Sequence, residues 1–364
     1  MLTRILSFFL ALFSFLSLNP ITDYDYSDKL GDKNYKGFKE YYADYFDIGA
    51  AVAGYHCVLP DTSAFLLKNF STLTAENSFK QDTLNPADGK WNYADADIIA
   101  NFCKTNGIKL RGHCLIWGNL GSWMTRDSSG NLVSKEVLLQ RMHNYISTVV
   151  NRYKSVVRVW DVVNEPFGYD IQGGAFKAND FYTICGEEYI TKAFEYAHEA
   201  DPTAVLCLNE TTVLSNQTKQ NYFLKYLEKW IDAGVPIHAV GLQSHWNLFE
   251  INVTPRRLQK LIDKLDKIGV DIQITECDMN IDAYKDDVFD ELPKYIELLQ
   301  SRKLSQLFEV LRKNADKISS VTFWGVNDDR PQINSDGQVC YRWALLFDRN
   351  SMPKNAFYAV CDFS

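Results

Sequence analysis

Short apolar runs rich in β-branched residues alternate with longer amphipathic stretches from about residue 46 to the end of the chain. Runs of this kind, bounded by polar residues, are typical of buried strands. The pattern predicts strands at Asp47–Val52, Asn69–Thr74, Lys109–His113, Val156–Val163, Ala204–Leu208, Ala239–Gln243, Asp271–Thr275 and Ser320–Trp324.

The stretches between these strands have helical periodicity. Within Lys135–Arg152 one stripe carries the apolar side chains, namely Val137, Leu138, Met142, Tyr145, Ile146, Val149 and Val150. Asn221–Ala233 has a similar pattern. Strands joined by helical crossovers form a parallel sheet, and eight such repeats favour the α/β class and a single (β/α)8 TIM barrel over an open sheet. Residues 49–54 do not form the G-x-G-x-x-G turn, and the chain has no P-loop, so a nucleotide site is not indicated.

The N-terminal 45 residues lack this alternation of apolar runs and amphipathic stretches. Arg4 precedes an apolar run, residues 5–18, that is short for a membrane span, and polar Asn19 and Pro20 end it. We interpret residues 1–19 as a signal peptide, with an N-terminal anchor or a buried helix as the alternatives. Residues 20–45 are read as a polar, solvated arm or short leading helix. No Pro/Gly/Ser-rich linker divides residues 46–364, so we expect one domain there. The predicted signal peptide implies a secreted, extracellular protein.

Composition narrows the function classes. The chain has 364 residues, of which 46% are hydrophobic and 14% aromatic, which is enough for a large core and for rings on a binding surface. A formal net charge of -8 argues against a nucleic-acid partner. No later stretch is apolar enough to cross a bilayer, so we expect no membrane association once the signal is removed, and a monomer.

Eight cysteines follow the predicted signal peptide. An even number in a secreted chain predicts disulfides, although their pairing cannot be read from the sequence. Zinc is the competing interpretation, but no C-x-x-C or H-E-x-x-H spacing is present. We therefore expect no metal.

The chemistry of a barrel lies at the carboxyl ends of its strands. The fourth predicted strand runs into Asn164 and Glu165, and the seventh into Glu276 and Asp278. Alone, Glu165 could be a first-turn helix carboxylate favoured by the helix dipole. Two carboxylates facing one cleft are what glycoside hydrolysis requires, because one donates a proton to the leaving oxygen and the other attacks the anomeric carbon.

With these motifs the chain resembles glycoside hydrolase family 10, the endo-β-1,4-xylanases, from about Phe46 to Val360. Six blocks carry the resemblance in order: 74–80 (TAENSFK), 111–117 (RGHCLIW), 160–166 (WDVVNEP), 241–245 (GLQSH), 274–278 (ITECD) and 322–326 (TFWGV). The resemblance implies a secreted retaining endo-1,4-β-xylanase that needs no cofactor and acts on xylan or xylo-oligosaccharides.

The resemblance also implies roles for particular residues. Glu165 would be the general acid and then base, and Glu276 the nucleophile. His245 would bond Glu276 as well as serve the substrate site, and Asp278 would orient His245. The remaining predicted substrate-binding residues are Glu76, Asn77, Lys80, His113, Trp117, Asn164, Asn209, Gln243 and Trp324, with Trp117 and Trp324 as the platforms for sugar rings. Trp91 and Trp230 are assigned to packing.

The sequence departs from the family at several positions. Asn209 is followed by Glu210, Thr211 and Thr212 where the family usually has Asp and Tyr, and the last loop lacks a second tryptophan, for which Trp343 or Tyr341 are the candidates. Cys114 and Cys277 are less usual and could form disulfides near the mouth. Two alternatives stay open: another retaining β-glycanase of the same superfamily, and a glycan-binding protein without catalysis.

Overall fold

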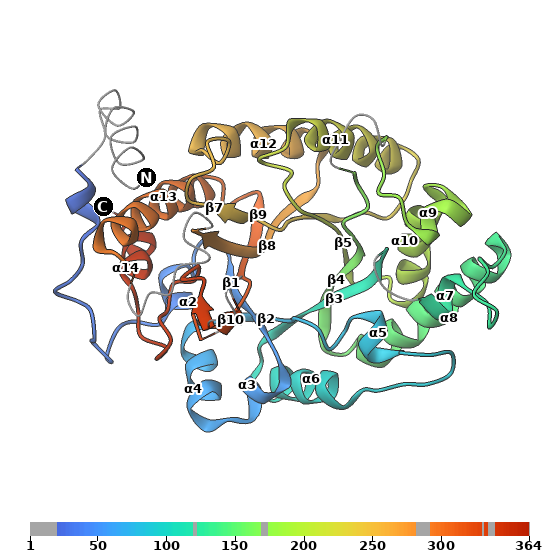
Figure 1. The fold of residues 1–364 in the computed structure, drawn as a ribbon, viewed down its shortest axis with the longest axis horizontal. Coiled ribbons are helices and arrows are strands. Elements are labelled where there is room, and N and C mark those ends of the chain that lie inside the picture. Colours follow the sequence, from blue (N-terminus) through green and yellow to red (C-terminus); the bar gives the residue numbers. More distant parts are fainter. Residues whose placement is uncertain are drawn as a thin grey trace.

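The computed structural model describes residues 20–118, 122–168, 174–281, 292–329, 331–333 and 339–363, so the predicted signal peptide lies outside the described residues. Eight parallel strands close into a barrel, which confirms the predicted fold class (Figure 1). They are β1 (Asp47–Val52), β2 (Thr72–Ala75), β3 (Lys109–Trp117), β4 (Val157–Asn164), β5 (Val205–Glu210), β6 (Ala239–Leu242), β8 (Asp271–Asn280) and β9 (Ile318–Phe323).

Each strand pairs with its neighbour in this order, and the pairs β6–β8 and β9–β1 complete the ring. A short additional strand, β7 (His245–Asn247), pairs in parallel with the end of β8 and places His245 opposite Asp278. Outside the barrel, β10 (Pro331–Ile333) and β11 (Val339–Tyr341) form an antiparallel pair. The sequence pattern predicts none of these three short strands.

Helices surround the strands (Figure 1). They are the 3-10 helix η1 (Ile21–Tyr24) and the α-helices α2 (Phe38–Tyr41), α3 (Gly54–Val58), α4 (Pro60–Asn69), α5 (Gln81–Leu84), α6 (Ala94–Asn106), α7 (Ser122–Thr125), α8 (Lys135–Tyr153), α9 (Asp180–Cys185), α10 (Glu188–Ala200), α11 (Gln217–Asp232), α12 (Pro255–Ile268), α13 (Lys294–Lys313) and α14 (Asn355–Cys361). The predicted stripe of α8 is buried except for Val137, which lies in the first turn and is 41% exposed.

The second strand begins later than the sequence predicts. Helix α4 starts with Pro60 at its first turn and continues through Asn69, whose side chain accepts from the backbone N–H of Phe38 and donates to the carbonyl of Phe65. These bonds hold Asn69 in the helix, so pairing with β1 begins only at Thr72. The β-branched residues of this run do form a strand, but the hydrogen bonds of Asn69 keep the first predicted residue in the helix.

Residues 20–45 contain the two short helices η1 and α2 and are anchored to the barrel by aromatic side chains. Tyr26, Tyr35, Phe38 and Tyr42 in this segment are buried in the main core, and the Tyr26 hydroxyl donates to a carboxylate oxygen of Asp362 at 2.9 Å. In Figure 1 the segment lies beside α13 and α14. These anchors are spaced among polar residues, and the burial of the four rings decides where the segment lies.

The expectation of disulfides is wrong for the seven cysteines whose side chains the structure describes, because all seven are free thiols. Cys114 on β3 and Cys277 on β8 are buried in the barrel wall, and burial raises the pKa of both thiols well above the ordinary value. They behave as small apolar core residues. Within the described residues, no helix is long and apolar enough to cross a bilayer.

Candidate active site

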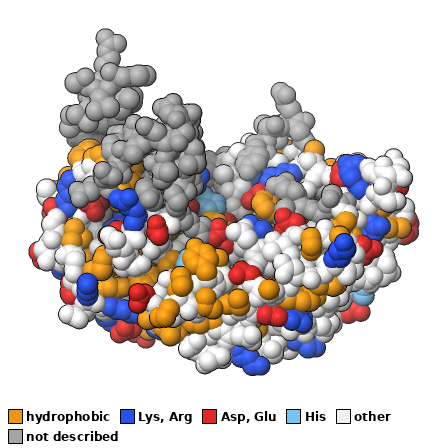
Figure 2. Space-filling view, turned by 60° about the horizontal axis from the view of Figure 1, so that its bottom comes forward, with side chains coloured by type: hydrophobic (Ala, Val, Ile, Leu, Met, Phe, Trp, Pro, Cys, Tyr) orange, Lys and Arg blue, Asp and Glu red, His pale blue; other side chains and the backbone are white. Residues whose placement is uncertain are grey.

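The carboxyl ends of the barrel strands converge on a hollow. Figure 2 shows a notch along the upper edge of this view, in which histidine and acidic side chains are visible. Two adjoining pockets open there: one is lined by residues that include Asp278 and Trp324, and the other by residues that include Gln243 and His245. The predicted site residues therefore come together at the mouth where barrel chemistry lies.

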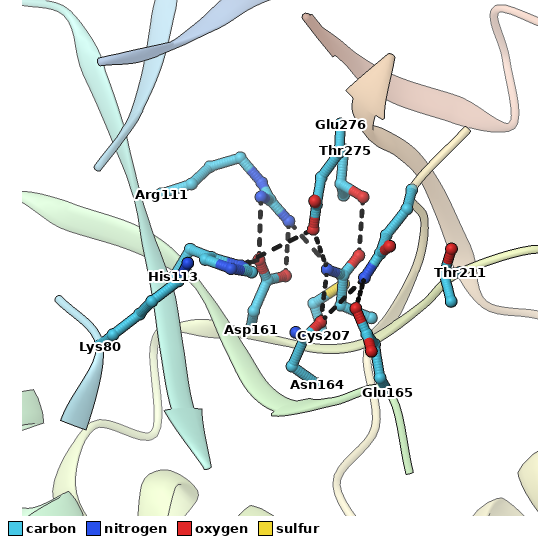
Figure 3. A network of polar contacts seen from close by, with 12 residues as sticks. Lys80, Arg111, His113, Asp161, Asn164, Glu165, Cys207, Thr211, Thr275 and Glu276 are labelled. Carbon is cyan, nitrogen blue, oxygen red and sulfur yellow. Dashed lines mark hydrogen bonds and ion pairs between the residues drawn. The ribbon is translucent and has the colours of Figure 1, made fainter. Parts of the chain in front are cut away.

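Glu276 is held by two side chains and has a third nearby. It lies in β8 and is 4% exposed. Asn209 Nδ2 donates to Glu276 Oε1 at 2.7 Å, and His245 Nε2 lies 3.0 Å from Oε2. His113 Nδ1 lies 4.0 Å from Oε1 (Figure 3). A carboxylate bonded at both oxygens has a fixed orientation, as a nucleophile needs.

His245 joins Glu276 to Asp278. Its Nδ1 lies 3.0 Å from Asp278 Oδ2, so each ring nitrogen faces a carboxylate. Burial lowers the pKa of His245, but hydrogen bonds to Asp278 and Glu276 outweigh it and raise the pKa to about 10. At neutral pH the ring is therefore an imidazolium that donates to both carboxylates. This confirms the contacts that the sequence analysis predicts for His245 and Asp278.

Glu165 follows β4 on a strained turn. Its φ is 51°, in the left-handed region that residues other than glycine rarely adopt, and its N–H donates to the Asn209 carbonyl at 2.9 Å. Lys177 Nζ donates to Oε2 at 2.5 Å and Gln243 Nε2 to Oε1 at 3.1 Å. Burial raises the pKa of Glu165, but the hydrogen bond and charge of Lys177 outweigh it, so the pKa lies below its ordinary value.

A chain of amides links the two glutamates. Gln243 Nε2 reaches both Glu165 and Asn164 Oδ1, and Asn209 Nδ2 reaches both Asn164 Oδ1 and Glu276. Because Gln243 and Asn209 both donate to the Asn164 oxygen, Asn164 Nδ2 is the atom oriented to donate to a ligand. Glu165 and Glu276 are thus set in one frame (Figure 3).

Asn209 is placed by the strands on either side of it. It is fully buried in β5, and Thr275 Oγ1 donates to its Oδ1 at 2.6 Å. A Cβ on Gly241 of β6 would lie 2.2 Å from that same Oδ1, so the glycine makes room for the amide. Asn209 therefore positions Glu276, and the direct sugar contact inferred for it from the sequence stays a prediction.

His113 is supported from below by an ion pair. Its Nδ1 lies 2.9 Å from Asp161 Oδ2, and Arg111 bonds both Asp161 oxygens, at 2.8 and 3.2 Å. Burial raises the pKa of Asp161, but the charge of Arg111 together with the hydrogen bonds of His113 and Arg111 outweighs it and lowers the pKa, so Asp161 is ionised. An ionised acceptor fixes a proton on His113 Nδ1 and the orientation of the ring.

The rim carries the other predicted contacts. Lys80 Nζ donates to Asn77 Oδ1 at 2.8 Å and lies 5.1 Å from the centre of the Trp117 ring. Glu76 is half-buried beside them. Trp324 packs edge-on against His113, with ring centres 5.1 Å apart. The half-buried faces of Trp117 and Trp324 suit the stacking role predicted for them, which stays a prediction.

The sequence analysis misses four residues of the site. Lys177 lies in the loop after β4, twelve positions beyond Glu165, where nothing in the pattern marks it. Arg111, Asp161 and Thr275 stand inside the motif blocks, beside residues that the analysis names. Arg111 lies two residues before His113 on β3, and alternate residues of a barrel strand share its interior. Asp161 lies opposite His113 in the register of β3 and β4, and Thr275 directly precedes Glu276.

The departures from the family are visible at this end of the barrel. Figure 3 draws Thr211 and Lys80 on opposite sides of Glu165, and the N–H of Thr211 donates to Glu210 Oε1 at 2.8 Å. Trp343 is 8% exposed and packs near Lys354, so it offers little surface to a cleft, while the side chain of Tyr341 lies outside the described residues. Trp230 is buried and Trp91 stacks between Tyr93 and Tyr145, which confirms their assignment to packing.

In the described part of the chain, no cluster of three or more His, Cys, Asp or Glu side chains could hold a metal ion. The acidic groups of the site are instead taken by partners: Glu276 and Asp278 by His245, Asp161 by Arg111 and Glu165 by Lys177. What the arrangement can do directly is acid, base and nucleophilic chemistry with two carboxylates.

A parallel barrel with one glutamate directly after β4, a second in the carboxyl-terminal half of β8 and an amide frame between them defines a site of the glycoside hydrolase class. Comparison with known sequences agrees. Residues 37–363 match the family described as "Glycosyl hydrolase family 10", and the chain belongs to that family. This confirms the resemblance, although the match begins inside the segment predicted as an arm.

Similar proteins cover most of the chain. An "Endo-1,4-beta-xylanase/feruloyl esterase" of Xylanibacter ruminicola is 37% identical over 90% of this chain, which spans only 47% of that protein. A "Beta-1,4-xylanase" of Dictyoglomus thermophilum is also 37% identical, over 89% of this chain and 90% of its own length. A solved structure, "A psychrophilic glycoside hydrolase family 10 endo-beta-1,4-xylanase", has a TM-score of 0.82, 39% identity and coverage of 90% of this chain and 100% of that one.

Proposed function

We propose that this protein is a secreted, monomeric endo-1,4-β-xylanase that cleaves internal bonds of xylan with retention of the anomeric configuration. The observation that carries the proposal is the pair Glu165 and Glu276, set in one hydrogen-bonded frame at the mouth of a family 10 barrel. Xylan as the substrate is supported by the relatives whose names describe xylanases.

The first chemical step forms a glycosyl-enzyme. A Glu276 oxygen attacks the anomeric carbon, and Glu165, in its protonated form, gives its proton to the oxygen of the leaving sugar as the glycosidic bond breaks. The His245 imidazolium and the Asn209 amide hold Glu276 for attack. Asn164 Nδ2 is oriented to donate to the sugar 2-hydroxyl, a bond that strengthens in an oxocarbenium-like transition state.

The second step releases the product. Glu165, now a carboxylate, takes a proton from a water molecule whose oxygen bonds to the anomeric carbon while the bond to Glu276 breaks. Retention by this route needs the two carboxyl groups about 5 to 5.5 Å apart, whereas inversion needs roughly 6.5 to 9.5 Å. Neighbouring donors orient both oxygens of Glu276, as a nucleophile needs, and this supports the proposed retention.

The test is hydrolysis of linear xylan and of carboxymethylcellulose by the purified protein, with the anomer of the first product followed by NMR. We expect rapid release of xylo-oligosaccharides, initial β-products and little action on the cellulose derivative. Glu276→Gln should lower the rate at least about a thousandfold. Glu228→Gln, an exposed change on α11, is the matched control and should leave the rate unchanged.

Three results would count against the proposal. Faster action on carboxymethylcellulose would favour another β-glycanase. Binding of xylan without release of reducing sugar would favour a glycan-binding protein. Initial α-products would mean inversion, and the assignment of Glu276 as nucleophile would then fail.

A further inference from the structure

Both oxygens of the Glu165 carboxylate are occupied by donors. Lys177 Nζ lies 2.5 Å from Oε2, and Gln243 Nε2 lies 3.1 Å from Oε1. The side chains of Lys177 and Glu165 are 19% and 16% exposed. An ammonium and a carboxylate in contact with so little water around them attract each other more strongly than an exposed pair does.

The fold fixes where this lysine stands. The loop after β4 turns back on itself, so that Phe167 and Phe176 form an antiparallel bridge and their rings stack at 5.4 Å. Lys177 comes next, and its N–H donates to the carbonyl of Pro166 at 2.9 Å. Phe167 and Phe176 are buried against Trp230. This packing fixes the backbone next to Lys177 and so places its ammonium beside Glu165.

Other charges around Glu165 act in the same sense. Lys219 of α11 is close enough for its charge to lower the pKa of Glu165, after the larger effects of burial and Lys177. Lys219 itself is paired at 2.8 Å with Glu210 of β5, and both side chains are fully buried. From β3, Cys114 stays a neutral thiol, and β6 presents the neutral Gln243. Glu276 and His245 form their own pair across the amide frame.

We propose that Lys177 is a positioning residue that holds Glu165 as the carboxylate needed in the second chemical step, at the expense of the protonated form needed in the first. This inference rests on the proposed function. Lys177 transfers no proton in either step. It changes only how much of the enzyme carries Glu165 in each form at a given pH.

The consequence is a division between two rates. Removing the ammonium leaves burial as the main influence on Glu165, so the protonated form persists to higher pH. Bond cleavage that needs an acid then continues to higher pH. Attack by water needs the carboxylate, so as the pH is lowered this step begins to slow at a higher pH than in the unmodified protein. A residue with a merely structural role would lower both rates together and leave their pH dependence in place.

The experiment compares Lys177→Met with Lys177→Arg. Turnover of xylan, whose leaving sugar needs a proton, reports the first step. Turnover of a saturating dinitrophenyl xylobioside, whose leaving group departs without one, reports the second. For Lys177→Met we expect two changes. The kcat/KM for xylan at pH 8, divided by its value at pH 5, should rise at least about threefold. The turnover of the dinitrophenyl xylobioside at pH 5 should fall at least about threefold. Lys177→Arg keeps the charge and should keep both profiles.

The inference would be overturned if Lys177→Met lowered both rates equally and left their pH profiles in place. It would also be overturned if Lys177→Arg shifted the pH profiles as much as Lys177→Met does. Titration of the Glu165 carboxyl by carbon NMR, assigned with Glu165→Gln, gives a readout that needs no substrate: its midpoint should rise in Lys177→Met, and an unmoved midpoint would overturn the inference. Absence of xylan hydrolysis by the unmodified protein would instead count against the proposed function alone.

Discussion

At the scale of single residues, the most consequential group is His245. Without its positive charge, Glu276 and Asp278 would be two carboxylates buried near each other, because only this ring separates them. Burial raises the pKa of Asp278 even with His245 beside it. The imidazolium therefore places a positive charge between these two carboxylates and fixes the orientation of the nucleophile.

This arrangement predicts how stability changes with pH. The pKa of His245 is raised from 6.5 to about 10, so its contribution is fully present below pH 6.5 and is lost as pH rises through about 10. We expect the free energy of unfolding of the unmodified protein to exceed that of His245→Gln by on the order of 2 kcal/mol near pH 6. Denaturant unfolding at several pH values measures this.

The difference between the two proteins should shrink steadily between pH 7 and pH 10, because tyrosines, lysines and cysteines titrate equally in both. A difference that stays constant across this range would show that His245 is not an imidazolium in the folded state.

At the scale of the elements, the site depends on how closely neighbouring strands approach. Gly241 of β6 leaves the space that the Asn209 amide of β5 occupies, and Thr275 of β8 closes it from the other side. The orientation of the nucleophile is thus set by three adjacent strands and not by one loop. A small change in the middle strand should therefore act on chemistry at the mouth.

Gly241→Ala tests this arrangement. The added Cβ would lie 2.2 Å from Asn209 Oδ1, so the amide must move and Glu276 loses its 2.7 Å bond. We expect kcat to fall at least about tenfold and the free energy of unfolding by about 1 to 3 kcal/mol. The effect on kcat should nearly vanish when Asn209→Ala is already present, since the glycine acts through that amide. Additive losses in the double variant would contradict this.

A second element-scale device is the buried ion pair between β5 and α11. Glu210 accepts from Lys219 Nζ and from the backbone N–H groups of Phe167 and Thr211, at 2.8, 3.0 and 2.8 Å respectively. It thereby ties the loop that follows Glu165 to two other elements. This glutamate stands where the family usually has aspartate.

Removing one partner of this pair should be costly. Lys219→Met leaves a buried carboxylate without its counter-charge, and we expect the free energy of unfolding to fall by about 3 to 5 kcal/mol. Adding Glu210→Gln removes the buried charge and keeps one acceptor oxygen for the backbone N–H groups, so the double variant should recover part of the loss. Chemical denaturation measures both. A cost below about 1 kcal/mol for Lys219→Met would contradict the account.

At the scale of the whole molecule, the sequence predicts the barrel because every strand carries its own pattern and its ends converge by geometry alone. The pair Glu165 and Glu276 follows from that convergence, whereas the roles of His245 and Asp278 come from the resemblance to the family. Lys177 does not, because its place depends on a loop that folds back through Phe167 and Phe176. Long-range packing of this kind leaves no periodic signal.

The same limit applies to the cysteines and to the N-terminal segment. The parity of cysteines says nothing of their separation, and the described thiols are dispersed through the barrel wall and its helices. The N-terminal segment is polar by count, but its position is decided by Tyr26, Tyr35, Phe38 and Tyr42, whose rings close the core beside α14. In both cases burial in three dimensions outweighs composition.

The central claim is that Glu276 attacks the anomeric carbon while Glu165 handles the proton. Incubation with a dinitrophenyl 2-deoxy-2-fluoroxylobioside tests it most directly, because the fluorine slows release of a glycosyl-enzyme more than it prevents its formation. Mass spectrometry of the intact protein and of its peptides should find one fluoroxylobiosyl group, attached to Glu276. An unlabelled protein that still turns over xylan, or a label on Glu165, would contradict the account.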